Sequence, residues 1–465
     1  MLTGHRVEDV RAAEEALAAT LPEGELMRRA SRGLADELCE IPPGEVVLCL
    51  IGPGNNGGDA LYAAVHLLDR GVRVDLCLLD DAKVHIEGLA AARSAGAQVV
   101  AAPTSQRWCL DALFGIGARP GLSGRAAEWA QWVEESRPQV IAVDVPSGVD
   151  VDGATRPGAS VRADSTVTFG TYKGGLLIEP AATMAGRIGL VDIGLTPYLP
   201  PARFESIEAS DGHLLAPALP QGSSHKYSRG VLGIAAGSEH YAGAAHLCVA
   251  GAQAGLAGMI RFLGDSALGE RIVDRAPEVV AERGRVQAWV VGPGSGDDAA
   301  AHLATALDDG VPLVVDASAL PHIPDTFDVP VLLTPHAGEL ADLLGVGRED
   351  VEADPLTHAT AAAERWNATV LLKGSRTLVV QAGAPVRVNL SGSPWLGTAG
   401  AGDVLAGFAG SLLAAGLAPR DAGSIAAYLH GVASVRANPG GPVVAADVAR
   451  ALPSTVAAFI RGSLA

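Results

Sequence analysis

The chain has 465 residues, 48% of them hydrophobic and 18% charged, so it is long enough for roughly two to four domains with apolar cores of their own. Its formal net charge of −18, without a run of lysines or arginines, argues against nucleic acid and anionic membranes as partners. The five cysteines are odd in number and widely spaced, which disfavours a disulfide framework or a zinc site and predicts a reducing, cytoplasmic location.

The first part of the chain alternates short apolar runs with helical patterns. Glu45–Ile51 reads as a buried strand, a Gly/Asn loop and a helix through Arg70 follow, and 72–79 and 140–143 read as further strands. Strands that alternate with helices predict parallel βαβ units, in which functional loops lie at the carboxyl ends of the strands. We therefore predict an α/β domain in this half.

Three loops rich in Gly, Asn, Asp and Ser follow predicted strands: Ile51–Asp59 (IGPGNNGGD), Asp111–Gly121 (DALFGIGARPG) and Asp144–Gly148 (DVPSG). Such turns expose backbone amides to an anion, although a purely structural turn has the same pattern and any one of the acids could cap a helix. The spacing is not GxGxxG, so an NAD-dependent redox site is not predicted. Oxygen ligands without a thiol or paired histidines suit a hard monovalent cation better than zinc.

In this order, and with LMRRA at Leu26–Ala30, the three motifs resemble the NAD(P)H-hydrate epimerase domain over about residues 1–205. The resemblance implies a Rossmann-like three-layer αβα fold, with Asp144 as the acid/base at the hydrated ring carbon. It implies that the dinucleotide is held by Asn55, Asn56, Gly57, Gly58, Asp59, Gly115, Ile116, Gly117, Ala118, Arg119, Pro120, Gly121 and Asp144. It implies that potassium is bound by Asn56, Asp111 and Ser147. The chain departs from the usual NNGGDG pattern at Ala60, and the role of the Arg119-Pro120 pair is open.

The alternation of predicted strands and helices is interrupted by a proline-rich stretch over residues 197–224 and continues after it. We place the boundary near residue 210, which predicts domains 1–209 and 210–465. The second half has strand-like runs at 231–235, 288–291, 312–315, 331–333 and 369–372.

The second half also contains Tyr241–Ile260, twenty residues without a formal charge, whose glycines and His246 favour a buried helix over a membrane span. Two long Ala/Gly-rich helical stretches follow near the C-terminus. They could pack subunits into the homo-oligomer that we expect, but the same composition serves an internal core.

A glycine-rich loop, Gly397–Asp403 (GTAGAGD), precedes one of these helices and is the firmest single motif. Glycines at a helix N-terminus allow close approach of an anion to unpaired N–H groups, so we interpret the loop as a phosphate or oxyanion cradle. Asp403 has two possible roles, as the N-cap of the helix or as the base that takes a proton from an attacking hydroxyl. Because a carboxylate with a pKa near ~4 is a weak base, the second role would depend on positioning and on the anion hole.

Five motifs in order resemble the ADP-dependent NAD(P)H-hydrate dehydratase, a branch of the ribokinase superfamily, from about residue 225 to the C-terminus. These are HKYSRG with GIAAGSEHYAGAA, VVGPGSG, LTPHAGE, LLKGSRT and the cradle itself. The resemblance implies a ribokinase-like αβα domain in which Asp403 is the catalytic base. It implies that the hydrated dinucleotide contacts Ala244, Gly296, His336 and Asp403, and that the nucleotide contacts Lys373, Gly374, Ser375, Arg376, Thr377 and Gly402. Taken alone, His336 would be a loop histidine and Lys373 a solvated lysine. Ser318 and Ser393 depart from the family pattern.

Together the two resemblances imply a metabolite repair enzyme that acts on hydrated NADH and NADPH. The first domain would interconvert the R and S hydrates, and the second would dehydrate the S form at the expense of ADP, with Mg²⁺, releasing AMP and phosphate. Two rivals remain open: a ribokinase-type kinase of a small alcohol fused to an unrelated domain, and an N-terminal domain that serves as a non-enzymatic docking module. A stable phosphorylated product would favour the first rival, and Asp144 with the potassium-type oxygens argues against the second.

Overall fold

The computed structural model describes residues 1–254 and 256–464, which divide into two units. One unit is Thr3–Phe204, and the other runs from Glu205 to the end of the described residues and includes Met1 and Leu2. The division lies just before the predicted boundary between residues 209 and 210, which stays a prediction. Each unit has its own sheet and cores, and the predicted α/β class of both halves is confirmed.

The N-terminal domain is built on one parallel sheet with the strand order β4-β3-β2-β5-β6-β7-β9. Its strands are β1 Leu2–His5, β2 Val46–Ile51, β3 Arg73–Leu78, β4 Gln98–Val99, β5 Trp108–Ala112, β6 Gln139–Val143, β7 Ser165–Phe169, β8 Tyr172–Lys173 and β9 Arg187–Val191. Its helices are α1 Val7–Ala18, α2 Glu25–Glu37, α3 Asn55–Asp69, α4 Ile86–Ala95, α5 Gly124–Ser136 and the short α6 Gly174–Leu177, with 3₁₀ turns at Ala181–Met184 and Thr196–Tyr198. The short strands β1 and β8 pair with each other in parallel and do not belong to this seven-stranded sheet.

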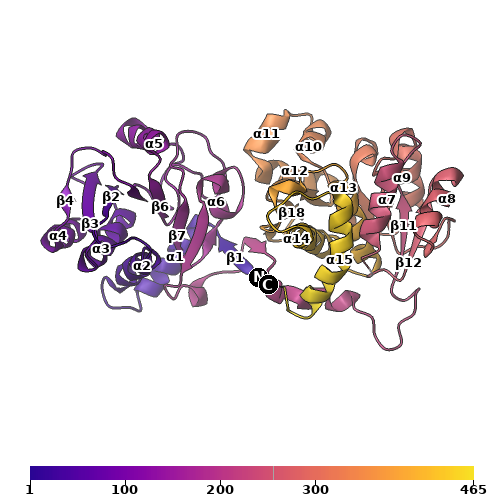
Figure 1. Cartoon of the computed structure of the whole chain (residues 1–465), viewed down its shortest axis with the longest axis horizontal. Coiled ribbons are helices and arrows are strands. Elements are labelled where there is room, and N and C mark those ends of the chain that lie inside the picture. The colour runs from indigo at the N-terminus through magenta and orange to yellow at the C-terminus, as the bar shows by residue number, and fades with distance from the viewer. Residues whose placement is uncertain (255, 465) are drawn as a thin grey trace. The chain divides into compact units, whose positions relative to one another are not determined.

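The alternation of side chains along β2 explains why this sheet is covered on both faces. Val47, Cys49 and Ile51 belong to the core formed with α1 to α4, whereas Leu48 and Leu50 belong to the core formed with α5. Figure 1 shows α5 on one side of these strands and α2 and α3 on the other. A parallel strand buried on both faces must be apolar throughout, and this is why the VVLCLI run predicts it.

The C-terminal domain has a sheet in which β13-β12-β11-β14-β15-β16-β17-β18-β19 are successive neighbours. Its strands are β10 Phe204–Ser206, β11 Val231–Ala235, β12 Met259–Leu263, β13 Val279–Val280, β14 Ala288–Val291, β15 Leu313–Val315, β16 Val331–Leu333, β17 Thr369–Leu372, β18 Leu378–Val380 and β19 Val386–Val388. Its helices are α7 Ala242–Ala252, α8 Ser266–Arg275, α9 Ala299–Asp308, α10 Ala337–Leu344, α11 Arg348–Ala353, α12 Pro355–Trp366, α13 Ala401–Ala414, α14 Pro419–Ala437 and α15 Ala445–Ile460, with 3₁₀ segments at Ala209–Ala218, Gly296–Asp298, Ala317–His322 and Pro394–Leu396.

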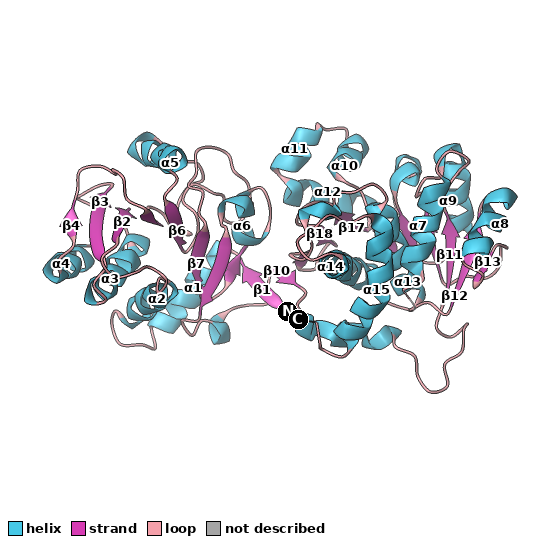
Figure 2. Cartoon of the chain, in the orientation of Figure 1, coloured by secondary structure: helices cyan, strands magenta, loops and turns pink. Residues whose placement is uncertain are grey.

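One face of this second sheet is covered by α7, α13, α14 and α15, which share a large core of small side chains with alternate residues of β11 such as Leu232 and Ile234. Helices α9 and α12 pack against β14 and β17 through side chains outside that core, so the other face is covered as well. Figure 2 shows the strands of each domain flanked by helices. Three long Ala-rich helices, not two, follow the cradle, and α13 is buried along nearly its whole length.

The composition of the uncharged run Tyr241–Ile260 predicts one buried helix, and this prediction is wrong for the whole run. Helix α7 ends at Ala252 and strand β12 begins at Met259, while residue 255 lies outside the described residues. Alanine and glycine suit both a helix and a tight connection, so composition does not show where the helix ends. None of the described helices has the length and hydropathy needed to cross a membrane.

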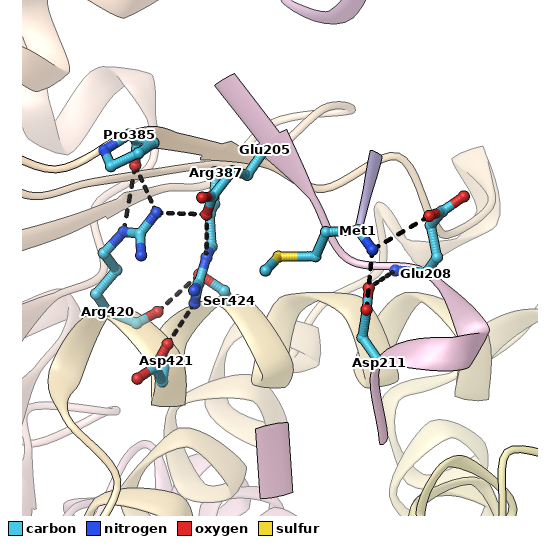
Figure 3. Close-up of polar contacts among 9 residues, drawn as sticks. All are labelled: Met1, Glu205, Glu208, Asp211, Pro385, Arg387, Arg420, Asp421 and Ser424. Carbon is cyan, nitrogen blue, oxygen red and sulfur yellow. Dashed lines mark hydrogen bonds and ion pairs between the residues drawn. The ribbon is translucent and has the colours of Figure 1, made fainter. Parts of the chain in front are cut away.

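A cluster of ion pairs joins three elements of the C-terminal domain (Figure 3). The carboxylate of Glu205 on β10 accepts hydrogen bonds from Arg387 Nε on β19 at 3.1 Å and from an Arg420 amine on α14 at 2.7 Å. Arg387 also pairs with Asp421 on α14. Arg387 is 6% exposed, so the cluster supplies the carboxylates that this buried cation needs.

Candidate active sites

The three predicted N-terminal loops meet at one edge of the sheet, because β2, β5 and β6 are neighbours and parallel. A cavity of about 820 Å³ opens there. Of the predicted dinucleotide residues, it is lined by Asn55, Asn56, Asp59, Gly115, Ile116, Gly117, Ala118, Arg119, Gly121 and Asp144. Gly57 and Gly58 are buried in the first turn of α3, and Pro120 lies outside the lining that the described residues form.

The first turn of α3 packs so closely on the loop before it that only glycine fits at position 57. A Cβ atom there would lie 2.3 Å from the carbonyl oxygen of Gly52. The helix begins after Gly54, which has a φ of +79° and provides no side-chain cap. Its first N–H groups therefore face a cavity that can receive a dinucleotide phosphate.

Asp144 follows β6 and is held in an unusual conformation, with a φ of +68° and 8% exposure. One carboxylate oxygen, Oδ1, accepts hydrogen bonds from Lys173 Nζ at 2.8 Å and from Thr168 Oγ1 at 3.2 Å. The other, Oδ2, accepts from the Ile116 amide at 3.3 Å. Left-handed backbone at a residue other than glycine is costly and concentrates at functional sites.

Lys173 is the main residue of this site that sequence reasoning misses. It is 1% exposed, and besides Asp144 it donates to Thr168 Oγ1 at 2.8 Å and to the Phe169 carbonyl at 3.0 Å. The segment GTYKGG follows β7, which is the neighbour of β6. Because loops that follow parallel strands lie at the same edge of the sheet, the sequence could have predicted that this segment joins the other three loops. Arg11 and Glu14 on α1 also line the cavity and were not predicted from the sequence.

Of the predicted potassium ligands, Asn56 lines this cavity, while Asp111 and Ser147 are buried and hydrogen-bonded to each other. The Ser147 hydroxyl and amide donate to Asp111 at 2.7 and 2.8 Å, and the Phe114 amide donates to Ser147 Oγ at 3.0 Å. The amide of Asn56, oriented with its nitrogen donating to the Val143 carbonyl, accepts from the Gly115 amide at 3.3 Å. Burial raises the pKa of Asp111 to about 6, against the lowering effect of its hydrogen bonds. Its donors are all neutral, so a monovalent cation coordinated by oxygen fits this carboxylate.

In the C-terminal domain, Asp403 is the third residue of α13, and the N-cap is Gly400 with a φ of +85°. The capping interpretation of Asp403 is therefore wrong. Position 400 favours glycine because its left-handed backbone strains any residue with a side chain. Burial and the charge of Asp316 raise the pKa of Asp403 to about 6, against the lowering effect of Lys373. Asp403 is thus a stronger base than an ordinary aspartate.

Lys373 lies between the cradle and two acids. A Cβ atom at Gly402 would be 3.6 Å from Lys373 Nζ. That amine donates to Asp316 Oδ1 at 2.9 Å and lies 3.5 Å from Glu339 Oε2. Burial opposes the charge of Lys373, but Asp316 and Glu339 outweigh it and raise the pKa of the amine. Lys373 is consequently a fixed cation and not a solvated surface lysine, and in the described residues it adjoins the helix N-terminus that would bind phosphate.

The rest of the nucleotide loop is a turn between β17 and β18. The Thr377 hydroxyl donates to the Gly374 carbonyl at 3.2 Å and closes this turn. Gly374 and Ser375 are exposed, while Arg376 is half-buried. Exposed backbone beside Lys373 suits contact with phosphate groups.

The residues predicted to contact the hydrated dinucleotide lie at neighbouring strand and helix ends. His336 is the N-cap of α10: its Nδ1 accepts from the Glu339 amide at 3.0 Å, and this leaves Nε2 as the protonated nitrogen. Ala244 on α7 adjoins the loop that carries Gly296, because a Cβ atom at Gly294 would lie 2.6 Å from the Ala244 methyl group. His336 is therefore more than a loop histidine without partners, since it caps a helix and can donate from Nε2.

Comparison with known proteins adds independent information about both halves. Residues 232–453 match the family model described as NAD(P)H-hydrate dehydratase, and residues 23–175 match the model described as YjeF-related protein N-terminus.

No cluster of three or more His, Cys, Asp or Glu side chains suited to a metal ion occurs in the part of the chain that the structure describes.

Two relatives cover nearly the whole chain. The bifunctional NAD(P)H-hydrate repair enzyme Nnr of Mycobacterium tuberculosis is 41% identical over 434 residues, which cover 89% of each protein. The enzyme of the same name from Mycobacterium leprae is 39% identical over 459 residues and 94% of each chain. The crystal structure of a ribokinase-like superfamily protein from Enterococcus faecalis covers 56% of this chain and 98% of its own, with 22% identity and a TM-score of 0.50, which concerns the fold alone.

Proposed function

The chain belongs to the family of bifunctional NAD(P)H-hydrate repair enzymes, and we propose from its two sites that it returns both epimers of hydrated NADH and NADPH to the reduced dinucleotide. The N-terminal domain interconverts the R and S hydrates, and the C-terminal domain dehydrates the S hydrate with ADP. The observation that carries the proposal is that each domain has a carboxylate close to a helix N-terminus. Asp144 lines the cavity together with the first residues of α3, and Asp403 lies in the first turn of α13.

In the C-terminal domain, Asp403 takes the proton of the ring hydroxyl as its oxygen attacks the β-phosphorus of ADP. The bond from that phosphorus to the bridging oxygen breaks, AMP leaves, and the hydroxyl becomes a phosphate ester. Elimination of phosphate then restores the ring double bond. The N–H groups near Gly402 and the ammonium of Lys373 stabilise the charge on the transferred group, and the pKa of Asp403, about 6, suits a base near neutral pH.

Mg²⁺ would enter with the nucleotide. The carboxylates near Lys373, those of Asp316 and Glu339, are already paired with that amine, so the described residues provide no dedicated cage for the ion. A magnesium ion held mainly by phosphates and water fits such a site, and it would offset phosphate charge during transfer.

In the N-terminal domain, potassium would be held by Asn56, Asp111 and Ser147, with the role of fixing the loops beneath the cavity. The dinucleotide would lie on the loops after β2 and β5, and Asp144 would act as acid/base on the ring carbon. The predicted contacts with Asn55, Gly117 and Arg119 rest on their place in the cavity lining.

We also propose a cytoplasmic location and a homo-oligomeric state. The first rests on five free cysteines, four of them buried, and the second on exposed apolar side chains such as Val435 and Ile460 on the outer helices. Light scattering of the purified chain measures the second, and a monomer at all concentrations would reject it.

The test of the repair function is recovery of the absorbance of the reduced ring. The full chain is incubated with mixed R and S hydrates of NADH, with ADP and Mg²⁺, and with K⁺ present or replaced by Na⁺. We expect full recovery, AMP and free phosphate in equal amounts. A stable phosphorylated product would favour a kinase, and no recovery with either ADP or ATP would overturn the proposal.

A further inference from the structure

The cavity of the N-terminal domain holds three acidic side chains that come from different elements. Asp144 follows β6, Asp59 lies on α3, and Glu14 lies on α1. Arg11 and Arg119 are among the other lining residues, and Lys173 lies behind Asp144. Such a set of acids around one ligand must differ in protonation, since like charges in a partly buried space repel one another.

The three acids have different electrostatic surroundings. Asp144 contacts the ammonium of Lys173 directly, at 2.8 Å. The charged groups that act on Asp59 are both acids, Asp144 and Glu14, and burial together with their charges raises its pKa well above the ordinary value. Burial also raises the pKa of Glu14, but Lys173 and Arg11 oppose this shift. Asp59 is consequently the acid of the three whose pKa is raised by burial with only other acids acting on it.

We propose that Asp59 is a second catalytic residue of the N-terminal site, the general acid that works with Asp144 as the base. The inference rests on the proposed epimerase function and deepens it. Asp59 and Asp144 line one cavity, and of the two only Asp144 is in direct contact with a cation among the described residues. Enzymes divide acid and base roles between two carboxyl groups by giving them different surroundings in this way.

The chemistry of the hydrate needs such a pair. The hydroxyl is carried by a ring carbon beside the ring nitrogen. Asp59 gives its proton to the hydroxyl oxygen, the carbon–oxygen bond breaks, and water leaves with the electron pair while the nitrogen lone pair forms a carbon–nitrogen double bond. Water then adds to the other face of the ring and gives a proton to Asp144. Return of that proton from Asp144 to Asp59 restores the site, so nothing is consumed.

The choice between Asp59 and Glu14 follows from their surroundings. Glu14 lies near Arg11, and both cations near it favour its charged form. No cation is among the groups that shift Asp59, and the structure shows no hydrogen bond from its described neighbours to its carboxyl group. Asp59 is thus the acid that is free to donate to a ligand.

The experiment compares Asp59→Asn with Glu14→Gln in the full chain, with ADP omitted so that the second domain does not consume the S hydrate. The R to S rate is followed by chromatography across pH, and incorporation of ¹⁸O from labelled water is measured in the product. In the wild type we expect a rate that falls at alkaline pH as Asp59 loses its proton, and one labelled oxygen for each epimerisation. Asp59→Asn should lower kcat by about 10²–10⁴-fold with little change in KM, and remove the alkaline fall.

Glu14→Gln is the matched variant, because it removes one of the two charges that raise the pKa of Asp59. Its alkaline fall should remain and move to lower pH. If Glu14→Gln loses the alkaline fall, or Asp59→Asn keeps the wild-type profile, Asp59 is not the acid, although the epimerase function stands. Epimerisation without ¹⁸O uptake would overturn the proposed bond cleavage even if Asp59→Asn does not fold. A wild-type chain that does not accelerate epimerisation would overturn both proposals.

Discussion

At the edge of the N-terminal sheet, the carboxylate of Asp144 lies 2.8 Å from a buried ammonium group, whereas Asp403 in the C-terminal domain lies at the start of a helix under the influence of another acid, Asp316. The N-terminal arrangement places a cation in direct contact with the carboxylate. The C-terminal arrangement raises the pKa of the carboxyl group to about 6, which suits the proposed role of a base near neutral pH. The two sheets thus hold carboxyl groups with different surroundings, and the difference lies in whether a cation contacts the carboxylate directly or acts from farther away.

The largest expected effect comes from removing Asp403. Asp403→Ala should abolish recovery of NADH from both hydrates, with a loss of about 10²–10⁴-fold in the rate of S-hydrate dehydration, because the ring hydroxyl loses its base. The measurement is the absorbance of the reduced ring with ADP and Mg²⁺ at neutral pH. Its epimerisation of R to S without ADP should persist, and recovery at the wild-type rate would show that Asp403 is not the base.

Removing the carboxylate of Asp144 should affect the activity proposed for the N-terminal domain. Asp144→Asn should leave dehydration of the S hydrate intact and make recovery of the R hydrate as slow as its spontaneous epimerisation. The two phases of absorbance recovery from a mixture of hydrates measure both effects at once. Loss of S-hydrate turnover in this variant would contradict the assignment of the two activities to separate domains.

The sequence predicts the strands and the positions of the loops in both domains, because buried strands are apolar and loops after parallel strands lie at one edge of the sheet. The apolar runs at Val231–Ala235 and Ala288–Val291 predict β11 and β14 to the residue, since strands buried on both faces are apolar throughout. The loops after β2, β5 and β6 converge as expected from parallel strands. The predicted family membership and the two-domain α/β fold are confirmed.

The electrostatic part of the sites is not predictable from the sequence in the same way. Lys173 approaches Asp144 across 29 positions of the chain, and Asp316 raises the pKa of Asp403 across a much longer separation. Such pairs depend on side-chain geometry and burial, which no local pattern gives. The individual contacts with the dinucleotide and the nucleotide, and the domain boundary near residue 210, stay predictions.

The ion pair of Asp144 gives a prediction about stability. Lys173→Met should leave a carboxylate uncompensated in a buried site, with a loss of about 3–5 kcal/mol of folding free energy and a lower thermal midpoint at neutral pH. Asp144→Asn in the same chain should restore part of the loss, because the unpaired charge is gone. Lys83→Met is the control: it breaks the exposed pair with Asp80 at 3.0 Å and should leave the midpoint unchanged. Equal midpoints in the two lysine variants would show that the buried pair is not needed for stability.

The environment of Asp403 predicts a pH dependence for dehydration. Because the base must be charged, the rate should be full above the raised pKa and fall as the pH drops through about 6. Asp316→Asn removes a charge that raises this pKa, so the acid-side fall should move to lower pH. Asp265→Asn, which changes the N-cap of α8, should leave the fall in place. The pH–rate profile of the S hydrate at saturating ADP measures the shift, and movement to higher pH in Asp316→Asn would reverse the proposed electrostatics.

The smallest expected effect concerns Ala60, where the chain departs from the usual glycine after NNGGD. Ala60 is fully buried within α3, so its methyl group belongs to the helix and not to the dinucleotide cavity. Ala60→Gly should therefore lower the free energy of unfolding by about 2 kcal/mol, through the lower helix propensity of glycine and the loss of one buried methyl group. Ala63→Gly, at another fully buried position of α3, should cost a similar amount in the same urea titration. The epimerisation rate of both variants should stay close to that of the wild type. A tenfold loss confined to Ala60→Gly would mean that this methyl group positions the loop that carries Asp59, and it would tie the acid to the departure from the family pattern.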